Sequence, residues 1–303
     1  MKKRVNLKRI EDKHLIKVFS EVDKFYNKIR RGRPRKYNES LIYFALAYKI
    51  LKKLSFRDLV FELKNKFKEF PTLSTLHYRI SRVNINLLRY FIKKLANKIK
   101  NIYKNFKYLI ADGTGFGYSD TFYMKLLRGE KLRKAKYHTK AEVLIYANDD
   151  NITFIEDINL DKAYSDERKL LFDIIKYKKF NNKIYFLADK LYSQSNKLAK
   201  FLILKTNLIP VVSISDALRN KVRNPDRLKL KQFFDENKNI YKKRYLIEQT
   251  FGKIKNSYYD KDFTFSLHLS KIYTAMKFLL YNIAVFALLC FLFFEHTNFA
   301  LDI

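Results

Sequence analysis

A segment near the C-terminal end of the chain, residues 241–255, carries four side chains that could handle a phosphate or a metal ion. They are Tyr241, Arg244, Glu248 and Lys255, at offsets of three, seven and fourteen residues. On an α-helix that turns about 100° per residue, these offsets predict one shared stripe. A carboxylate flanked by a phenol, a guanidinium and an ammonium suits a metal ion and a phosphate diester. The plain alternative is a surface helix in which Glu248 only pairs with Arg244.

Two further carboxylates end short apolar strands in similar contexts. Asp112 ends Leu-Ile-Ala-Asp, and Asp189 ends Phe-Leu-Ala-Asp. If these strands are parallel neighbours, both carboxylates project at one edge of the sheet, where Glu248 can join them. Three oxygen ligands in one cleft bind Mg²⁺ or Mn²⁺, and two such ions can drive phosphoryl transfer. A strand-ending aspartate is also a common turn residue, and other acids compete for the ligand role: Asp120, Asp149, Asp150, Asp157 and Asp166.

The spacing within residues 241–255 resembles the Tyr-x2-Arg-x3-Glu-x6-Lys signature of the DDE transposases that prokaryotic insertion sequences encode. The resemblance implies a catalytic domain with two bound ions of Mg²⁺ or Mn²⁺. It assigns DNA contacts near the scissile phosphate to Tyr241, Arg244 and Lys255. It assigns catalysis and metal binding to the three acids, Asp112, Asp189 and Glu248.

The stretch after the second acid departs from the pattern of this family. Asp189-Lys-Leu-Tyr192 resembles the Asp-x-Gly-Tyr of the family, but Leu191 stands where glycine is usual. A different turn is therefore expected after this strand. The short distance from Asp189 to Glu248 also leaves no room for the large β-rich insertion that some relatives carry.

The elements that must position these residues form an α/β pattern. Apolar and alternating segments predict strands at 108–112, 140–147, 151–158, 183–188 and 208–214, and a helix at 166–177. Three antiparallel strands followed by parallel strands and helices make an RNase H-like topology. The predicted fold class is therefore α/β, an RNase H-like mixed sheet flanked by helices, in a catalytic domain at 105–303.

Two segments after the first strand are expected to lie outside the sheet. Gly113, Gly115 and Gly117 are half of the six glycines of the chain, and glycine permits a sharp turn or the close approach of a ligand. Residues 122–138 are rich in lysine and arginine and predict a cationic loop.

Residues 1–104 predict an all-helical region that binds DNA. A basic arm at 30–36 contains Arg-Gly-Arg-Pro, similar to the AT-hook core that lies in a narrow minor groove, or it is a solvated linker. Two helices within 55–83 predict a helix-turn-helix, or else a plain helical bundle. The expected DNA contacts, the last two of them close together on the second helix, are Arg31, Arg33, Arg35, Arg79 and Arg82.

The composition of the chain favours a polyanionic partner. The 303 residues include 63 basic and 30 acidic side chains, a net charge of +33, so double-stranded DNA is expected first and an anionic membrane second. The single cysteine, Cys290, excludes a disulfide framework within the chain. No signal peptide is visible at the N-terminus, so a cytoplasmic location in a prokaryote is expected, at the nucleoid when DNA is bound.

One segment, 275–294, is apolar enough for a membrane span. Lys277 and Asn282 lie inside it, and it closely follows the signature segment. These features favour a buried core helix at 271–294 over a membrane span.

Together the sequence predicts a DNA transposase that binds the terminal inverted repeats of its element. Such an enzyme cleaves phosphodiester bonds and joins 3′ ends to target DNA by two-metal-ion phosphoryl transfer. Bringing two ends together predicts a homodimer on DNA. Two alternatives stay open: a metal-dependent nuclease of the same fold, and a non-catalytic DNA-binding protein from a decayed element. The presence of all three acids argues against the second.

Overall fold

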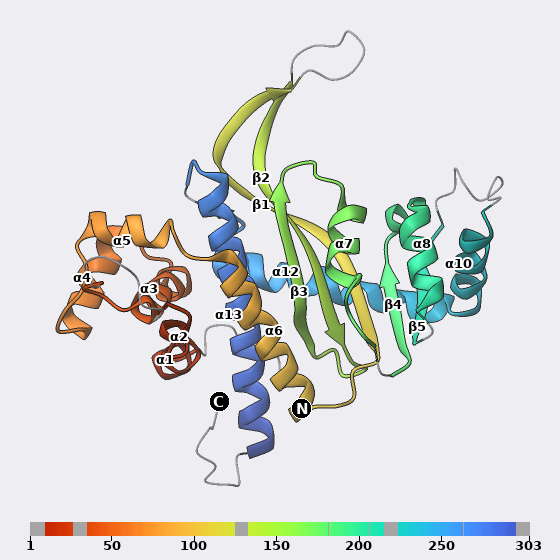
Figure 1. Cartoon of the computed structure of the whole chain (residues 1–303), viewed down its shortest axis with the longest axis horizontal. Helices are drawn as coiled ribbons and strands as arrows, with labels where there is room; N and C mark the ends of the chain where they lie inside the picture. Colours follow the sequence, from red (N-terminus) through yellow and green to blue (C-terminus); the bar gives the residue numbers. More distant parts are fainter. Residues whose placement is uncertain are drawn as a thin grey trace.

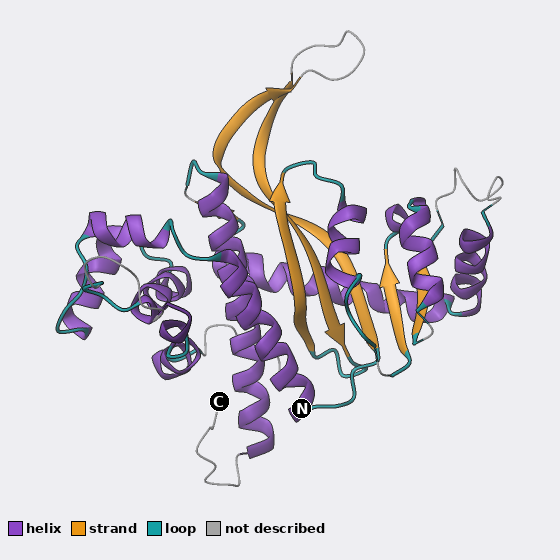
Figure 2. Cartoon of the chain, viewed as in Figure 1, coloured by secondary structure: helices purple, strands orange, loops and turns teal. Residues whose placement is uncertain are grey.

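The computed structural model describes residues 10–26, 35–124, 133–180, 182–205, 207–214, 224–262 and 264–294. These residues form a helical region beside an α/β region with one mixed sheet, as Figure 1 and Figure 2 show. The helices before the sheet are α1 (Asp12–Phe19), α2 (Val22–Tyr26), α3 (Glu39–Lys52), α4 (Phe56–Lys66), α5 (Leu73–Ile80) and α6 (Ile85–Ile102).

The α/β region follows, with two short 3-10 helices labelled η. Its first half contains β1 (Tyr108–Met124), β2 (Arg133–Ala147), β3 (Thr153–Lys162), α7 (Glu167–Ile175), β4 (Ile184–Ala188), η2 (Lys190–Gln194) and α8 (Asn196–Leu204). Its second half contains β5 (Leu208–Val212), α10 (Pro225–Glu236), α11 (Lys238–Tyr241), η3 (Lys242–Arg244), α12 (Tyr245–Tyr258), β6 (Lys261–Asp262) and α13 (Leu267–Phe294).

The sheet has the strand order β3-β2-β1-β4-β5, and the two-residue strand β6 pairs with the far part of β1. Strands β1, β2 and β3 are antiparallel, whereas β4 and β5 run parallel to β1. Parallel neighbours need a crossover, and α7 and α8 provide helices for it. The predicted α/β fold, an RNase H-like mixed sheet flanked by helices, is confirmed.

Strand β1 is longer than predicted, because it runs through all three glycines. The expected turn at Gly113 is therefore wrong, and so is the expected loop at 122–138 where the structure describes it. Beyond the sheet β1 and β2 continue as a curved two-stranded arm (Figure 1), and 125–132 lie outside the described residues. The glycines allow close packing instead, since a Cβ at Gly113 would lie 2.8 Å from Glu167 Oε1.

Helix α3 is the centre of the helical region. All its residues from 42 to 48 are buried, because α1, α4, α5 and α13 surround it. The connection between α4 and α5 covers 67–72, which is longer than the roughly three- to four-residue turn of a helix-turn-helix. Helix α5 ends at Ile80, so Arg82 lies in the turn that follows and not on the helix as predicted.

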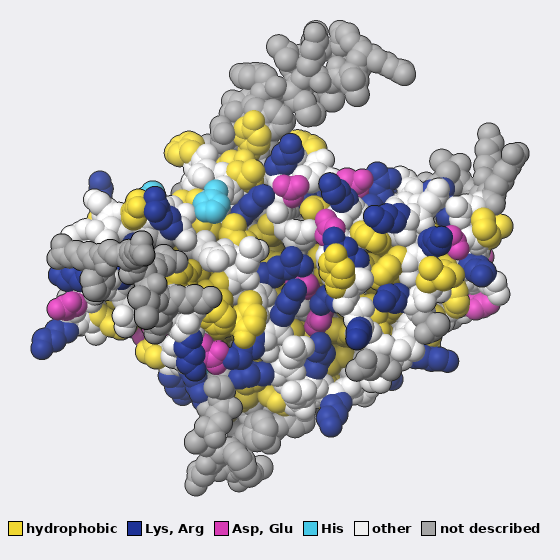
Figure 3. Space-filling model, in the orientation of Figure 1, with side chains coloured by type: hydrophobic (Ala, Val, Ile, Leu, Met, Phe, Trp, Pro, Cys, Tyr) yellow, Lys and Arg dark blue, Asp and Glu magenta, His cyan; other side chains and the backbone are white. Residues whose placement is uncertain are grey.

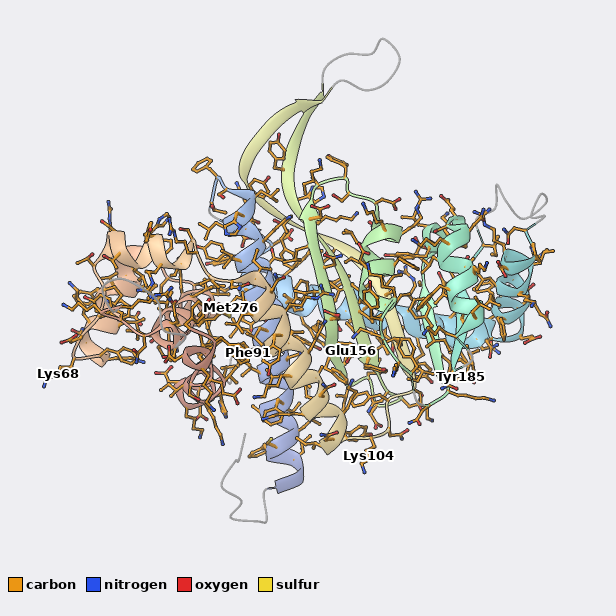
Figure 4. The ribbon with its side chains drawn as sticks, viewed as in Figure 1. Lys68, Phe91, Lys104, Glu156, Tyr185 and Met276 are labelled. Atoms are coloured by element: carbon orange, nitrogen blue, oxygen red, sulfur yellow. The ribbon has the colours of Figure 1, made fainter. Side chains whose placement is uncertain are left out.

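Helix α13 packs between the helical region and the sheet. Among the described residues it is the one helix long and apolar enough to cross a membrane, and 78% of its most apolar window is buried inside the protein. Met276 of α13 and Phe91 of α6, both labelled in Figure 4, are buried where these helices pack. The structure thus uses this segment as a core helix, which begins earlier than the predicted 271.

One polar side chain of α13 serves an irregularity of the sheet. Strands β2 and β3 shift register between Leu144 and Ile145, which leaves Glu156 as a bulged residue. Asn282 is fully buried beside this bulge and makes two hydrogen bonds to the backbone of Ile155, one to the N–H and one to the carbonyl, each 2.8 Å long. Its amide also donates to a carbonyl of α6 at 3.2 Å. The asparagine therefore joins α13, β3 and α6.

We expect Asn282→Leu to lower the free energy of unfolding by about 2–4 kcal/mol, because buried backbone groups of β3 and α6 lose their partner. Urea unfolding followed by circular dichroism measures this change. The neighbouring substitution Ile283→Leu should stay below about 1.5 kcal/mol, since it keeps volume and polarity. Equal losses in the two variants would show that packing, and not hydrogen bonding, is the role of residue 282.

Candidate active site

The parallel pairing of β1 with β4 brings two acids together. Ala111 pairs with Ala188, so the next residues, Asp112 and Asp189, lie side by side where β4 ends. The prediction that their strands are parallel neighbours is confirmed. Asp112 does not end its strand as predicted, because β1 continues through it to Met124. Asp189 leaves the sheet and caps η2, and its Oδ1 accepts a hydrogen bond of 2.7 Å from the Lys190 N–H. The turn with leucine in place of glycine is thus a 3-10 helix.

Arg244 connects the first acid to the third. Its Nη1 lies 2.9 Å from Asp112 Oδ2, and its Nη2 lies 2.7 Å from Glu248 Oε1. The side chain of Asp112 is 19% exposed, whereas that of Glu248 is 57% exposed. The pairing of Glu248 with Arg244 within one helical segment is present, as the plain alternative expected. The same guanidinium also reaches strand β1, which a simple surface helix would not require.

The signature segment, residues 241–255, was predicted to form one continuous α-helix. This prediction is wrong. Helix α11 ends at Tyr241, residues 242–244 form a 3-10 turn, and α12 begins at Tyr245. A 3-10 turn winds more tightly than an α-helix, so the angular positions calculated for a uniform helix do not apply across it. Arg244 ends the turn and Glu248 lies one α-turn later, which lets one guanidinium meet both Glu248 and Asp112.

The two remaining residues of the signature have different surroundings. Tyr241 is partly buried and packs edge-on against Phe234, with 5.1 Å between ring centroids. Burial raises the pKa of Tyr241, and Arg244 opposes this rise. Lys255 instead pairs with Asp260, 3.0 Å away in the connection after α12. The structure therefore brings Tyr241 into the electrostatic neighbourhood of the acids and gives Lys255 a partner of its own.

The electrostatics of Asp112 differ from those of an exposed aspartate. Burial raises the pKa of Asp112 to about 6, although Arg244 and the Gly113 N–H both favour the charged form. The negative charges of Asp189 and Glu167 contribute further to the rise. A carboxyl group whose pKa is raised by burial and by neighbouring negative charge is a feature of functional sites.

The donor chemistry of this site fits a divalent cation, because carboxylate oxygens are the ligands that Mg²⁺ and Mn²⁺ prefer. Asp112 and Glu248 already share one positive group, the guanidinium of Arg244. Within the described part of the chain, no three His, Cys, Asp or Glu side chains are placed to hold one ion. Metal binding would therefore require Arg244 to move away from Asp112 and the acids to close.

The sequence reasoning missed a buried carboxyl group near Asp112. Glu142 of β2 lies opposite Gly113, is 0% exposed, and accepts hydrogen bonds of 2.8 and 3.0 Å from the Tyr192 hydroxyl. Burial raises the pKa of Glu142 well above its usual range. Glu167 of α7 is also close to Asp112 and pairs with Lys140. The signal in the sequence that could have identified this residue is a glutamate inside the otherwise apolar run 141–147.

The competing acids have other partners. Asp149 and Asp150 lie in the hairpin turn before β3, Asp157 is buried beside α6, and Asp166 caps α7. Their partners are Lys107 for Asp149, Tyr103 for Asp150, Arg89 for Asp157 and Arg168 for Asp166. Nothing is described for the side chain of Asp120.

Two of the arginines expected to contact DNA are engaged within the protein. Arg35 and Arg79 both form ion pairs with Glu39 at the start of α3. The Arg79 side chain is 16% exposed and also donates to the Tyr37 carbonyl at 3.3 Å. This placement gives Arg79 a structural role in the helical region.

Arg82 has the opposite character, because it is exposed at the end of the turn after α5. Its guanidinium lies over the ring of Tyr78, 4.2 Å from the centroid. Arg31 and Arg33, in the predicted basic arm, lie outside the described residues.

We expect Asp112→Asn to raise the free energy of unfolding of metal-free protein by about 2 kcal/mol at neutral and higher pH. The pKa of Asp112 is raised on folding, so its protonated form stabilises the protein at low pH, and this contribution is lost as the pH rises through about 6. The difference between variant and wild type should therefore grow between about pH 5 and about pH 8.

Urea unfolding in EDTA at both pH values measures that difference. The control is Asp235→Asn, which removes an exposed carboxylate of α10 and should change the free energy of unfolding by no more than about 0.5 kcal/mol. A destabilised Asp112→Asn at the higher pH would contradict the raised pKa.

We expect Tyr192→Phe to reduce stability by about 1–3 kcal/mol, because the buried Glu142 loses the hydroxyl that donates to it. The control is Tyr185→Phe on β4, labelled in Figure 4, whose ring is partly exposed. That change should stay within about 0.5 kcal/mol. If both variants unfold at the same urea concentration, the Tyr192–Glu142 contact is energetically neutral.

Comparison with known proteins identifies the family of this chain. The family described as "Transposase DDE domain" matches residues 108–283, from the start of β1 into α13. An uncharacterized protein of Aquifex aeolicus (strain VF5) is 39% identical over 261 residues, which is 85% of this chain and 80% of that protein. Members of the family are DNA-binding enzymes that process nucleic acid and generally depend on a divalent metal. The chain, with its three acids around an RNase H-like sheet, belongs to the transposase DDE domain family.

Proposed function

We propose that this protein is a DNA transposase that binds the terminal inverted repeats of its element, cleaves there and joins the 3′ ends to target DNA. The observation that carries the proposal is that three distant segments bring these acids to one part of the sheet. Asp112 and Asp189 are neighbours through the β1–β4 pairing, and Arg244 links Asp112 to Glu248. A structural role alone would not require Arg244 to join a carboxylate of β1 to one of α12 beside the end of β4.

We assign metal binding and catalysis to Asp112, Asp189 and Glu248, with Mg²⁺ or Mn²⁺ as the cation and two ions as the number. When bound, the metal supplies an activated hydroxyl and stabilises the leaving oxygen of the phosphodiester. The protein's own contribution is positional. The sheet fixes Asp112, the N-cap of η2 fixes Asp189, and the first turn of α12 presents Glu248.

Arg244 has two alternative partners in this scheme. Without DNA its guanidinium neutralises Asp112 and Glu248, which would otherwise repel each other across a partly buried site. A guanidinium also binds a phosphate through two parallel hydrogen bonds. We assign Arg244 to a DNA phosphate once cations hold the acids, with Tyr241 beside it. In this exchange the acids are always paired with positive charge, first that of Arg244 and then that of the cations. The DNA phosphate is paired with Arg244.

Lys255 completes the assigned DNA contacts by exchanging Asp260, which is 64% exposed, for a phosphate. The transposition reaction needs two ends in one complex, so we propose a homodimer on DNA. A cytoplasmic location at the nucleoid follows from the same partner.

We expect each of Asp112→Asn, Asp189→Asn and Glu248→Gln to reduce cleavage of terminal-repeat DNA by at least about a thousandfold. Affinity for the same DNA should stay within about threefold, since each variant only removes negative charge from the site. The substrate is a duplex cloned from the flanks of the gene, with Mg²⁺, and denaturing gels follow the products. Full activity in any of the three variants would remove that acid from the metal site.

The same assay separates transposition from the nuclease of the same fold. Pre-cleaved ends incubated with a supercoiled plasmid should yield joined products, whereas a nuclease yields nicks alone. A protein from a decayed element would bind the ends and give neither product.

A further inference from the structure

A second basic site lies away from the three acids, between the helical region and the sheet. It is a groove of about 660 Å³ where the α5–α6 connection, the edge strand β3 and the start of α13 meet. Four cationic side chains line it, namely Arg35, Arg82, Arg89 and Lys271, together with His268. Among the described residues that line the groove there is no carboxylate, so its surface is suited to an anion.

Two of the three carboxylates that pair with cations of this groove also pair with other cations. Glu39 serves both Arg35 and Arg79. Asp157 is fully buried and serves Arg89 together with two lysines. Asp161 is the acid nearest to Lys271, at 3.4 Å. An excess of positive charge in a hollow concentrates field and attracts polyanions.

Arg82 is an exposed cation of this groove. Its side chain is exposed and stacks on Tyr78, and within the described residues it forms no ion pair. Stacking fixes the plane of a guanidinium without using its N–H donors, so they remain available to phosphate oxygens. On the face drawn in Figure 3, lysine and arginine outnumber the acidic side chains over α6 and the neighbouring sheet.

The groove and the candidate active site share one level of the sheet. Asp112 pairs with Val143, and Val143 pairs with Ile158, which lines the groove. Two strand spacings separate the two backbones, about 10 Å. Phosphates follow one another at about 3.4 Å along each strand of a duplex. A few base pairs of one duplex therefore span the distance between the two places.

We propose that this groove binds the phosphate backbone of the same duplex whose cleavage takes place at Asp112, through Arg82, Arg89 and Lys271. The inference rests on the proposed function for its partner, but it adds a contact surface outside the signature segment. It also gives the junction between the helical region and the sheet a role, since DNA in the groove would touch both.

The test measures the affinity of the full chain for a fluorescein-labelled duplex of about 30 base pairs and arbitrary sequence, from about 50 to 200 mM salt. The variants are Arg82→Gln, Lys271→Gln and the double variant. Each single change should weaken binding about three- to tenfold and reduce the slope of log affinity against log salt by about 1. The double variant should reduce the slope by about 2.

Lys68→Gln and Lys104→Gln are matched controls, because each removes one exposed positive charge at the edge of the molecule, as Figure 4 shows. They should leave the slope unchanged. Arg89 is not substituted, because its loss would remove an ion-pair partner of the buried carboxylate of Asp157. Unchanged thermal unfolding temperatures of the variants show that a loss of DNA affinity does not come from a loss of folded protein.

Groove variants that bind DNA like the two controls would overturn the inference while leaving the proposed function standing, provided that wild type binds with a steep salt dependence. A flat salt response of wild type would overturn both. Titration with inorganic phosphate is the remaining arm. Micromolar binding that disappears in the double variant would mean that the groove holds a free phosphate compound and not the duplex.

Discussion

The register between β1 and β4 is the constraint on which the site depends. Because Ala111 pairs with Ala188 in parallel, two acids distant in sequence become lateral neighbours. A shift of one residue would turn one of them to the opposite face, since side chains alternate along a strand. Burial of the flanking apolar residues fixes this register: Leu109, Ile110, Phe186 and Leu187 are all 0% exposed. The hydrophobic core thus determines where the carboxylates stand.

The charge of the site follows from that placement. Neighbouring carboxylates in a partly buried setting are unfavourable unless a cation accompanies them. In this structure the cation is Arg244, which the 3-10 turn before α12 directs toward Asp112 and Glu248. The raised pKa of Asp112 shows that this compensation is incomplete. A site of this kind favours the binding of a further cation, because added positive charge stabilises the neighbouring carboxylates.

Helix α13 shows how polar residues can make an apolar segment a core helix. Asn282 completes hydrogen bonds beside the bulge of β3, and Lys277 forms a buried ion pair of 2.6 Å with Asp262 in β6. Each contact ties the helix to a defined place on the sheet. Leucine at either position would preserve hydrophobicity but leave buried polar groups without partners. The helix therefore joins the helical region to the catalytic sheet in one arrangement.

The sequence by itself determined the α/β class, the succession of strands along the chain, the two acids of the paired strands and the buried C-terminal helix, because apolar and alternating segments are local properties of a chain. It overestimated turns at Gly113–Gly117, since nothing local reveals that Glu167 and His138 pack against those glycines. Only the tertiary structure decided that Arg244 bridges Asp112 and Glu248. It also decided that Glu142 is buried and bonded to Tyr192. In the helical region it paired Arg79 with Glu39 and left Arg82 exposed. Those outcomes depend on which side chains compete for one another across the fold, and spacing along a chain does not encode that competition.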